Sequence, residues 1–296
     1  MRICAAVVVM LVACAPASAQ LQGPADRFIT VDGLRLHYLD WGNESKPPLV
    51  MMHGIGRDAH SFDHIVPRFS RDYHVIAMDL RGHGDSAWHP DGAYLVEDLV
   101  KDLEGLVEQR SLRGLVLLGN STGGRVVQMY AGLHPDRVRA LIVEDVGPER
   151  PQDIAAGFAR RVQQEANGWG SEAELMTFLK AQSPTVSDDL IRAHARSSTK
   201  RRADGRLVWK RDPNLVKGFV PTELWQAVRR ITSPTLYILG GKSTIVSAAT
   251  QEQLKSTIPG CEIVVMPGLG HYPHLEAPAA YVELVAEFLS RRIPNP

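Results

Sequence analysis

One serine in the sequence stands where it could act as a nucleophile. Ser121 lies in the stretch 119–124, Gly-Asn-Ser-Thr-Gly-Gly, directly after the apolar run 115–118. A sharp turn from a buried strand into a helix strains the backbone of such a serine and exposes its hydroxyl, and the glycines let the turn close. The start of a helix also favours negative charge beside the serine. The sequence therefore predicts that Ser121 is a catalytic nucleophile.

A serine hydroxyl is a weak nucleophile at neutral pH and needs a base. The chain has eleven histidines, and position distinguishes His271. It lies in the glycine-rich loop 268–273, between the last predicted strand and the last predicted helix. This loop belongs at the carboxyl edge of the sheet, level with Ser121, so we expect His271 to be the base. We expect a structural role for His274, which would anchor the loop together with Glu276.

The elements that must position these residues follow an alternating pattern. Short β-rich runs alternate with helical patterns, which predicts a mostly parallel sheet covered by helices on its faces. The expected strands are 28–31 and 34–39, joined as a hairpin at Asp32-Gly33, then 49–52, 73–80, 115–118, 138–143, 234–239 and 262–266. The expected helices are 95–108, 125–133 and 278–289.

This alternation stops between residues 148 and 225, where the sequence is polar, helical in pattern and without a convincing buried strand. We expect a helical cap there, inserted after the sixth strand and dividing the core into residues 26–147 and 226–296. Basic residues gather in its second half, and we interpret them as a solvated face of the cap, with binding of an acidic substrate as the alternative. They are Lys200, Arg201, Arg202, Arg206, Lys210 and Arg211.

Four motifs in this order resemble the α/β-hydrolase superfamily over about residues 26–289, nearly the whole chain after its first residues. They are His53-Gly54-Ile55-Gly56, Asp79-Leu80-Arg81-Gly82-His83-Gly84-Asp85-Ser86, the serine turn, and Gly270-His271 with Pro273-His274-Leu275-Glu276. The resemblance implies an eight-stranded, mostly parallel α/β sheet with Ser121 as nucleophile and His271 as base. It also implies that the backbone amides of Ile55 and Thr122 form an oxyanion hole. His53, Arg81, His83 and Asp85 are interpreted as loop scaffold.

The third member of the expected triad departs from the commonest pattern of that superfamily. Its usual acid follows the seventh strand, where this chain has Ser243, and a serine cannot supply the charge that stabilises an imidazolium. The sixth strand ends in Glu144 and Asp145, and certain lactonases and the haloalkane dehalogenases are similar in placing the acid there. We expect Asp145 to be the acid, with Glu144 as the alternative. Side chains alternate along a strand, so only one of the two can face His271.

Composition limits the remaining classes of function. The 33 Lys and Arg residues balance 33 Asp and Glu residues, so no overall field attracts nucleic acid or an anionic membrane. We expect no metal and no cofactor. His60 and His64 lack the glutamate of a metalloprotease helix, and Gly54 and Gly56 lack the third glycine of a dinucleotide site.

The first 19 residues resemble a secretory signal peptide: one positive charge, a short apolar run and an Ala-Ser-Ala cleavage site before Gln20. The apolar run is too short to span a bilayer, so we expect an exported, periplasmic or secreted protein without a membrane span. The alternative is a lipoprotein anchored through Cys14, because the residues before that cysteine resemble a lipobox. Under the first interpretation Cys261 is the single thiol of the mature domain, and we expect it to be half-buried rather than catalytic.

These residues together predict a serine hydrolase that cleaves a small-molecule carboxylic ester or lactone through an acyl-enzyme. Two alternatives remain at this point. One is a C–C bond hydrolase of dienoate-type ring-cleavage products, whose serine turn is similar. The other is a catalytically silent binding protein that uses the same pocket. Trp169, Trp209 and Trp225 could line an apolar acyl pocket or belong to ordinary packing.

Overall fold

The computed structural model describes residues 23–150 and 152–293. The predicted leader (residues 1–19), with Cys14 and the cleavage site before Gln20, lies outside the described residues and stays a prediction. No helix within the described ranges combines the length and the apolar character that crossing a bilayer requires.

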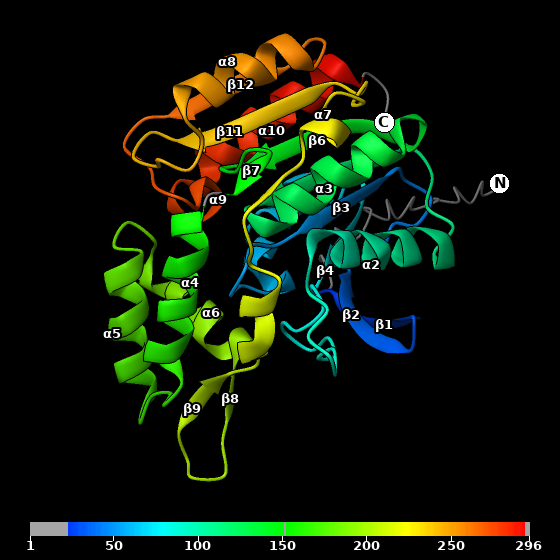
Figure 1. The fold of residues 1–296 in the computed structure, drawn as a ribbon. Coiled ribbons are helices and arrows are strands. Elements are labelled where there is room, and N and C mark those ends of the chain that lie inside the picture. Colours follow the sequence, from blue (N-terminus) through cyan, green and yellow to red (C-terminus); the bar gives the residue numbers. More distant parts are fainter. Residues whose placement is uncertain (1–22, 151, 294–296) are drawn as a thin grey trace, which may run out of the picture.

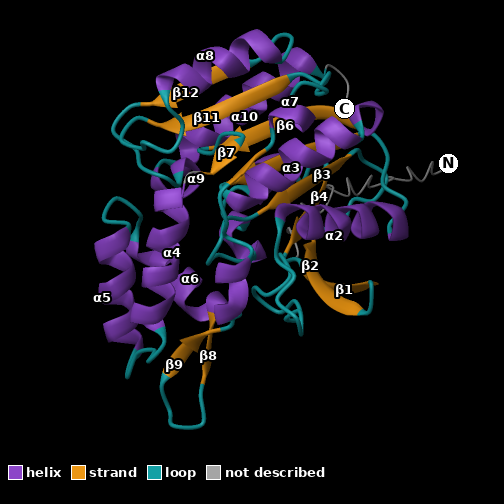
Figure 2. Ribbon diagram, viewed as in Figure 1, coloured by secondary structure: helices purple, strands orange, loops and turns teal. Residues whose placement is uncertain are grey.

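An eight-stranded sheet forms the centre of the molecule (Figures 1 and 2). Its order is β1-β2-β4-β3-β5-β6-β11-β12. The pairs β1·β2 and β2·β4 are antiparallel and the remaining pairs are parallel, which confirms the predicted fold class. The strands are β1 (Ala25–Val31), β2 (Leu34–Asp40), β3 (Pro48–Met52), β4 (His74–Met78), β5 (Leu115–Asn120), β6 (Val138–Glu144), β11 (Thr235–Gly240) and β12 (Glu262–Met266).

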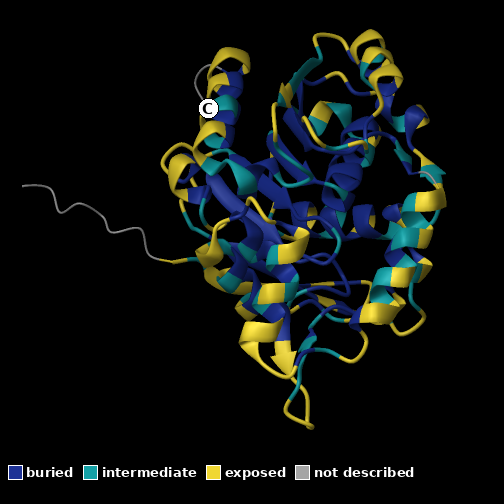
Figure 3. Cartoon of the chain, turned by 90° about the vertical axis from the view of Figure 1, so that its left-hand side faces the viewer, coloured by how far each residue is buried: buried dark blue, intermediate teal, exposed yellow. Residues whose placement is uncertain are grey.

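Helices cover both faces of this sheet, and the central strands are therefore buried on both sides, as the unbroken apolar run of β3 predicts. One face packs against α2 (Val96–Gln109), α3 (Thr122–Leu133), α7 (Trp225–Val228) and α8 (Ala248–Thr257). The other packs against η1 (Ala59–Phe62), α1 (Val66–Phe69) and α10 (Pro278–Arg292). In Figure 3 the central strands are dark blue, and the outer sides of the helices are yellow. Two short helices lie in loops: η2 (Pro135–Arg137) and α9 (Pro273–Glu276).

The cap segment (residues 148–225) follows β6 and carries its own apolar cluster around Trp169, Leu175 and Trp209. Its helices are α4 (Gln152–Glu165), α5 (Glu172–Gln182), α6 (Asp188–Ser198) and η3 (Pro213–Lys217). Its sequence shows no convincing buried strand, yet it contains four short ones: β7 (Glu149–Arg150), β8 (Thr199–Arg201), β9 (Leu207–Trp209) and β10 (Thr222–Glu223). The antiparallel pair β7·β10 joins the entry of the segment to its exit. Because each strand has only two or three residues, hydrophobic alternation could not reveal it.

The basic residues of the cap segment do not all lie on a solvated face. Lys200, Arg201 and Arg202 are exposed, as expected. Arg211 is buried, and its guanidinium forms an ion pair with the buried carboxylate of Glu165 in α4. The expectation of a solvated face is wrong for this arginine, because α4 supplies a carboxylate that compensates the buried charge.

Candidate active site

Ser121 lies at the turn between β5 and α3, with φ 51° and ψ −117°. This left-handed backbone conformation is costly for any residue except glycine, and it persists because the surrounding structure holds it. Helix α3 begins at Thr122, three residues earlier than predicted, so Ser121 stands directly at its N-terminus. A Cβ atom on Gly123 would collide with the carbonyl oxygen of Met52 in β3. Glycine at this position therefore lets the helix start against the neighbouring strand.

Asp145 follows the last residue of β6 and is almost completely buried. Its Oδ2 accepts a hydrogen bond from Nδ1 of His271 at 2.7 Å and another from the hydroxyl of Ser243 at 2.6 Å. Its Oδ1 accepts from the backbone amide of Gly240 at 2.9 Å. Asp145 also has a left-handed backbone, with φ 47°. The carboxylate is thus held from three sides, and Ser243, which replaces the usual acid, supports Asp145 instead.

The loop that carries His271 is held by the carboxylate of Glu276. This carboxylate accepts from the backbone amides of Gly270 at 2.9 Å and Tyr272 at 3.2 Å. The amide of Asn120, next to Ser121, donates to the carbonyl of His271 at 3.3 Å. Burial lowers the pKa of His271, but the hydrogen bond that Nδ1 donates to Asp145 and the charges around the ring outweigh this effect and raise the pKa above its ordinary value.

Glu144, the alternative acid, points away from His271. Its Oε1 accepts from both the backbone amide and Nδ1 of His274, at 3.0 and 2.7 Å. Both side chains are fully buried. His274 therefore anchors its loop through Glu144, whereas the sequence predicted Glu276 as its partner. The difference arises because α9 turns His274 inward under the sheet edge, while Glu276 faces the backbone of its own loop.

A cavity of about 240 Å³ opens over Ser121. Ser121 and His271 line it together with Ile55 and Thr122, the two residues predicted to form the oxyanion hole. The structure thus brings these four sequence-predicted residues to one cavity, with Asp145 behind His271. Trp169, Trp209 and Trp225 do not line it. They pack in apolar clusters, and Nε1 of Trp209 and of Trp225 donates to Glu165 and Glu149, respectively. The other lining residues are Arg125, Val146, Glu149, Arg150, Ile154, Gly157, Phe158, Arg161, Phe219, Ile245 and Tyr272.

The sequence did not single out several polar residues of this cavity. Tyr272 is one of them: burial raises the pKa of its phenol, yet the guanidinium of Arg57, stacked 4.3 Å from the ring centre, and the His271 ring outweigh burial and lower that pKa to about 8. Arg125 and Arg150 are two more, and both are buried. The sequence contains a signal for Arg150, because Glu149-Arg150 directly follows Pro148, where the cap segment begins. For Arg125 the sequence shows only a position on α3.

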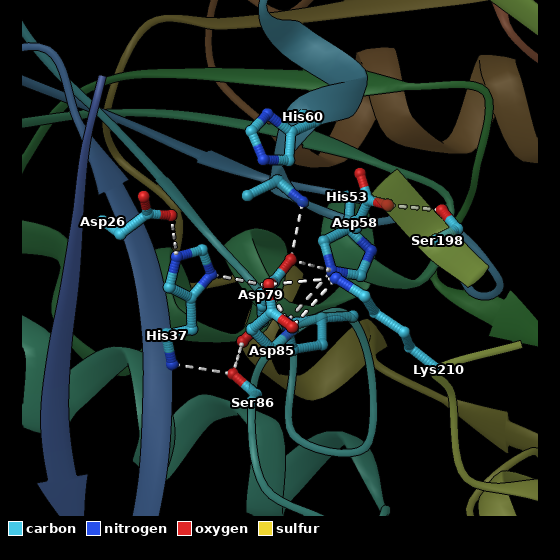
Figure 4. A network of polar contacts seen from close by, with 12 residues as sticks. Asp26, His37, His53, Asp58, His60, Asp79, Asp85, Ser86, Ser198 and Lys210 are labelled. Carbon is cyan, nitrogen blue, oxygen red and sulfur yellow. Dashed lines mark hydrogen bonds and ion pairs between the residues drawn. The ribbon is translucent and has the colours of Figure 1, made fainter. Parts of the chain in front are cut away.

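The motif around Asp79, which the sequence analysis interpreted as loop scaffold, lies behind the site rather than in it. Figure 4 shows Asp79 at the centre of a buried network. Its carboxylate accepts from Nδ1 of His37 at 2.7 Å and from the backbone amides of Ala59 and Asp85 at 2.7 and 2.9 Å. His53 also faces this network, and its Nε2 accepts from the amide of Leu80 at 3.0 Å rather than reaching the cavity. These contacts fix the loops after β3 and β4.

The same network continues into the cap segment (Figure 4). The hydroxyl of Ser198, at the end of α6, donates to the buried carboxylate of Asp58. Lys210 reaches Asp85 at 2.9 Å from the other side of the segment. Two separate polar contacts therefore tie the cap segment to the core loops. Within the part of the chain that the structure describes, no group of three or more His, Cys, Asp or Glu side chains is placed to hold a metal ion.

Known proteins match this chain along most of its length. A diacylglycerol lipase of the mouse, sn-1-specific, is 26% identical over 275 residues, covering 84% of this chain and 83% of that protein. A 2-hydroxy-6-oxo-6-(2'-aminophenyl)hexa-2,4-dienoic acid hydrolase of Metapseudomonas resinovorans is 25% identical over 289 residues, covering 90% and 91%. The crystal structure of E-2-(acetamidomethylene)succinate hydrolase matches with a TM-score of 0.81 at 26% identity, covering 90% of this chain and 99% of that one.

The family model for the alpha/beta hydrolase fold matches residues 47–278, which include the serine turn, both candidate acids and the histidine loop. The eight-stranded sheet, the strained serine and the matched relatives agree with one another. This chain belongs to the α/β-hydrolase fold family.

Proposed function

We propose that this hydrolase cleaves a carboxylic ester or lactone through an acyl-enzyme on Ser121. The hydroxyl oxygen of Ser121 attacks the carbonyl carbon while Nε2 of His271 takes the proton. The carbonyl oxygen becomes an oxyanion, which the backbone amides of Ile55 and Thr122 stabilise. When the intermediate collapses, the C–O bond to the alcohol breaks and the imidazolium returns its proton to the alcohol oxygen. Water then repeats the same steps on the acyl-enzyme and releases the acid.

Asp145 orients the base in this mechanism. Its bond to Nδ1 leaves Nε2 directed away from the carboxylate, and its charge stabilises the imidazolium that forms during the reaction. The observation that carries the proposal is this pair, because its histidine lines the same cavity as a strained serine at a helix N-terminus. The lipase among the relatives, whose name states an ester-cleaving activity, supports the same chemistry.

A fluorophosphonate probe tests the nucleophile directly, because it reacts with an activated serine whatever the natural substrate is. We expect labelling of the wild-type protein on the peptide that contains Ser121, and none of Ser121→Ala. Ser256→Ala, on the exposed face of α8, is the matched control and should label like the wild type. Hydrolysis of p-nitrophenyl acetate by a protein that does not label at Ser121 would refute the mechanism.

The second candidate function is C–C bond hydrolysis, and the dienoic acid hydrolase among the relatives supports it. The two activities share a serine and a histidine, so labelling does not separate them. Comparing kcat/KM for short methyl esters with that for a vinylogous 1,5-diketo dienoate separates them. We expect the esters to be the better substrates. A protein that labels and cleaves the dienoate faster would favour the second function, and one without label or turnover would be a binding protein.

A further inference from the structure

Arg150 lies in the active-site cavity on the side of the residue that follows Ser121. Its Nη2 is 3.5 Å from the hydroxyl of Thr122, and its Nη1 donates to the carbonyl of Gly218 at 3.2 Å. The ring of Phe219 lies 4.1 Å from the guanidinium carbon. Only 8% of the residue is exposed. A buried cation is therefore placed beside the proposed oxyanion hole, with two long hydrogen bonds to neutral oxygens.

Among the residues that the structure describes, no carboxylate pairs with this charge. Within residues 23–150 and 152–293, no acidic side chain comes within ion-pair distance of Arg150. The acidic residue among those that line the cavity is Glu149, and both of its oxygens are already used. One accepts from Nε1 of Trp225 at 2.8 Å and the other from the hydroxyl of Thr250 at 3.0 Å. Glu149 thus belongs to the attachment of the cap segment rather than to Arg150.

Two further arginines line the cavity, and they differ in what they bind. Arg161 is paired with Glu165 at 2.8 Å. Arg125 donates to the carbonyl of Pro148 at 2.7 Å and to the hydroxyl of Thr222, so it holds the two ends of the cap segment with neutral acceptors. Its Nε is buried without a hydrogen-bond partner in the described chain. The cavity therefore contains more positive than negative charge.

Burying a guanidinium without a counter-charge is costly, because water no longer solvates it. Burial, and then repulsion from Arg125, lower the pKa of Arg150 to about 9. A carboxylate in the cavity would relieve this cost, since a guanidinium presents paired donors that match the two oxygens of a carboxylate.

We propose that the substrate carries a free carboxylate close to the scissile carbonyl, and that Arg150 binds it. This inference rests on the proposed ester or lactone hydrolysis. The carboxylate must be only a few bonds from the reacting carbon, because Arg150 stands next to Thr122, which adjoins the nucleophile. A cavity of about 240 Å³ suits such a small acid. The positive charge of Arg125 also attracts the anion, while its N–H groups keep their hydrogen bonds to the cap segment.

Two esters of the same shape test this specificity. Monomethyl succinate carries the carboxylate, and methyl 4-methylpentanoate replaces it with an uncharged branched group of equal size. We expect the wild-type protein to favour monomethyl succinate in kcat/KM by about 10-fold or more, since hydrogen bonds to charged groups contribute this much. Arg150→Gln should abolish the preference, and Arg150→Lys should retain part of it. The control is Arg192→Gln, which changes a partly exposed arginine of α6 paired with Asp189 and should keep the wild-type ratio.

Calorimetry of the Ser121→Ala protein with monomethyl succinate measures binding without turnover. We expect binding that is lost in Ser121→Ala/Arg150→Gln, while Ser121→Ala/Arg192→Gln still binds. Equal turnover of the two esters, or an equal loss for both in Arg150→Gln, would overturn the inference and leave the proposed function standing. A protein that does not label with fluorophosphonate but binds the acid through Arg150 would contradict the proposed function and support the carboxylate site.

Discussion

Two carboxylate–imidazole pairs stand side by side at the end of β6, and they differ above all in how far each histidine is exposed. Asp145 binds His271 and Glu144 binds His274, each with 2.7 Å between carboxylate oxygen and Nδ1. The side chain of His271 is 25% exposed and lines the cavity, whereas that of His274 is 1% exposed. Each pair joins a carboxylate oxygen to Nδ1 of a histidine at the same distance. Access to a substrate therefore distinguishes a pair that can transfer protons from one that only holds the fold.

The two carboxylates also form hydrogen bonds with different neighbouring groups. The backbone amide of Gly240 and the hydroxyl of Ser243 both bind the carboxylate of Asp145, so His271 is oriented by a carboxylate that is itself fixed. Glu144 binds the backbone amide of His274 as well as its ring. It thereby fastens the start of α9 to the sheet. One carboxylate orients a base and the other closes a loop.

The largest effect that separates the pairs should come from removing the charge of each carboxylate in turn. Asp145→Asn should lower kcat for p-nitrophenyl acetate about 10⁴-fold, because the histidine loses both its orientation and the stabilisation of its imidazolium. Glu144→Gln should leave kcat far less affected, since His274 does not reach the cavity. Steady-state kinetics on both purified variants measures this contrast. If Glu144→Gln caused the larger loss, the acid would be assigned to the wrong pair.

Stability should show the opposite ranking. Glu144→Gln weakens two buried hydrogen bonds to a charged group, and we expect it to reduce the free energy of unfolding by about 1.5–3 kcal/mol. Asp145→Asn should cost less, because the cavity lets water reach His271 when the ion pair is lost. Urea denaturation of both variants, followed by circular dichroism, compares them. A more stable Glu144→Gln protein would mean that this pair does not hold the loop.

Ser243→Ala should have a smaller effect on catalysis. It removes one donor to Asp145 but leaves the amide of Gly240 and the bond to His271 in place. We expect kcat to fall about 2- to 10-fold, as for the loss of one ordinary hydrogen bond. Ser256→Ala serves as the control and should leave kcat unchanged. A loss that approached that of Asp145→Asn would show that Ser243 does more than support the carboxylate.

The pH profile should show the smallest but most specific difference. His271 must be neutral to accept a proton, and its pKa is raised. The midpoint of the acid limb in the kcat/KM profile should therefore lie above about pH 6.5, the ordinary pKa of histidine. Asp145→Asn removes the main cause of the raised pKa, so its remaining activity should persist to lower pH. Rates from pH 5 to 9 on the wild type and the variant measure this shift, and a limb that stayed in place would exclude His271 as the group that titrates.

Much of the fold could be predicted from the sequence because its signals are local. Apolar runs such as 115–118 mark strands buried on both faces, and the glycines around Ser121 mark a turn that only small residues allow. The four short strands of the cap segment were missed, because two or three residues cannot show a hydrophobic period. Helix α3 also starts earlier than its apolar pattern does, since Thr122 and Gly123 are placed by packing against β3.

The sequence by itself determined that Ser121 follows a buried strand, that His271 lies in a loop at the same sheet edge, and that Ser243 cannot be the acid. Alternation along β6 showed that only one of Glu144 and Asp145 could face the histidine, and the absence of the usual acid favoured the second. Tertiary structure alone decided three further points: which histidine meets which carboxylate, that Glu276 binds backbone amides, and that Arg150 is buried in the cavity without a counter-charge from any described residue. These depend on contacts between segments as far apart as β7, α3 and the His271 loop, and no local pattern in the chain records such contacts.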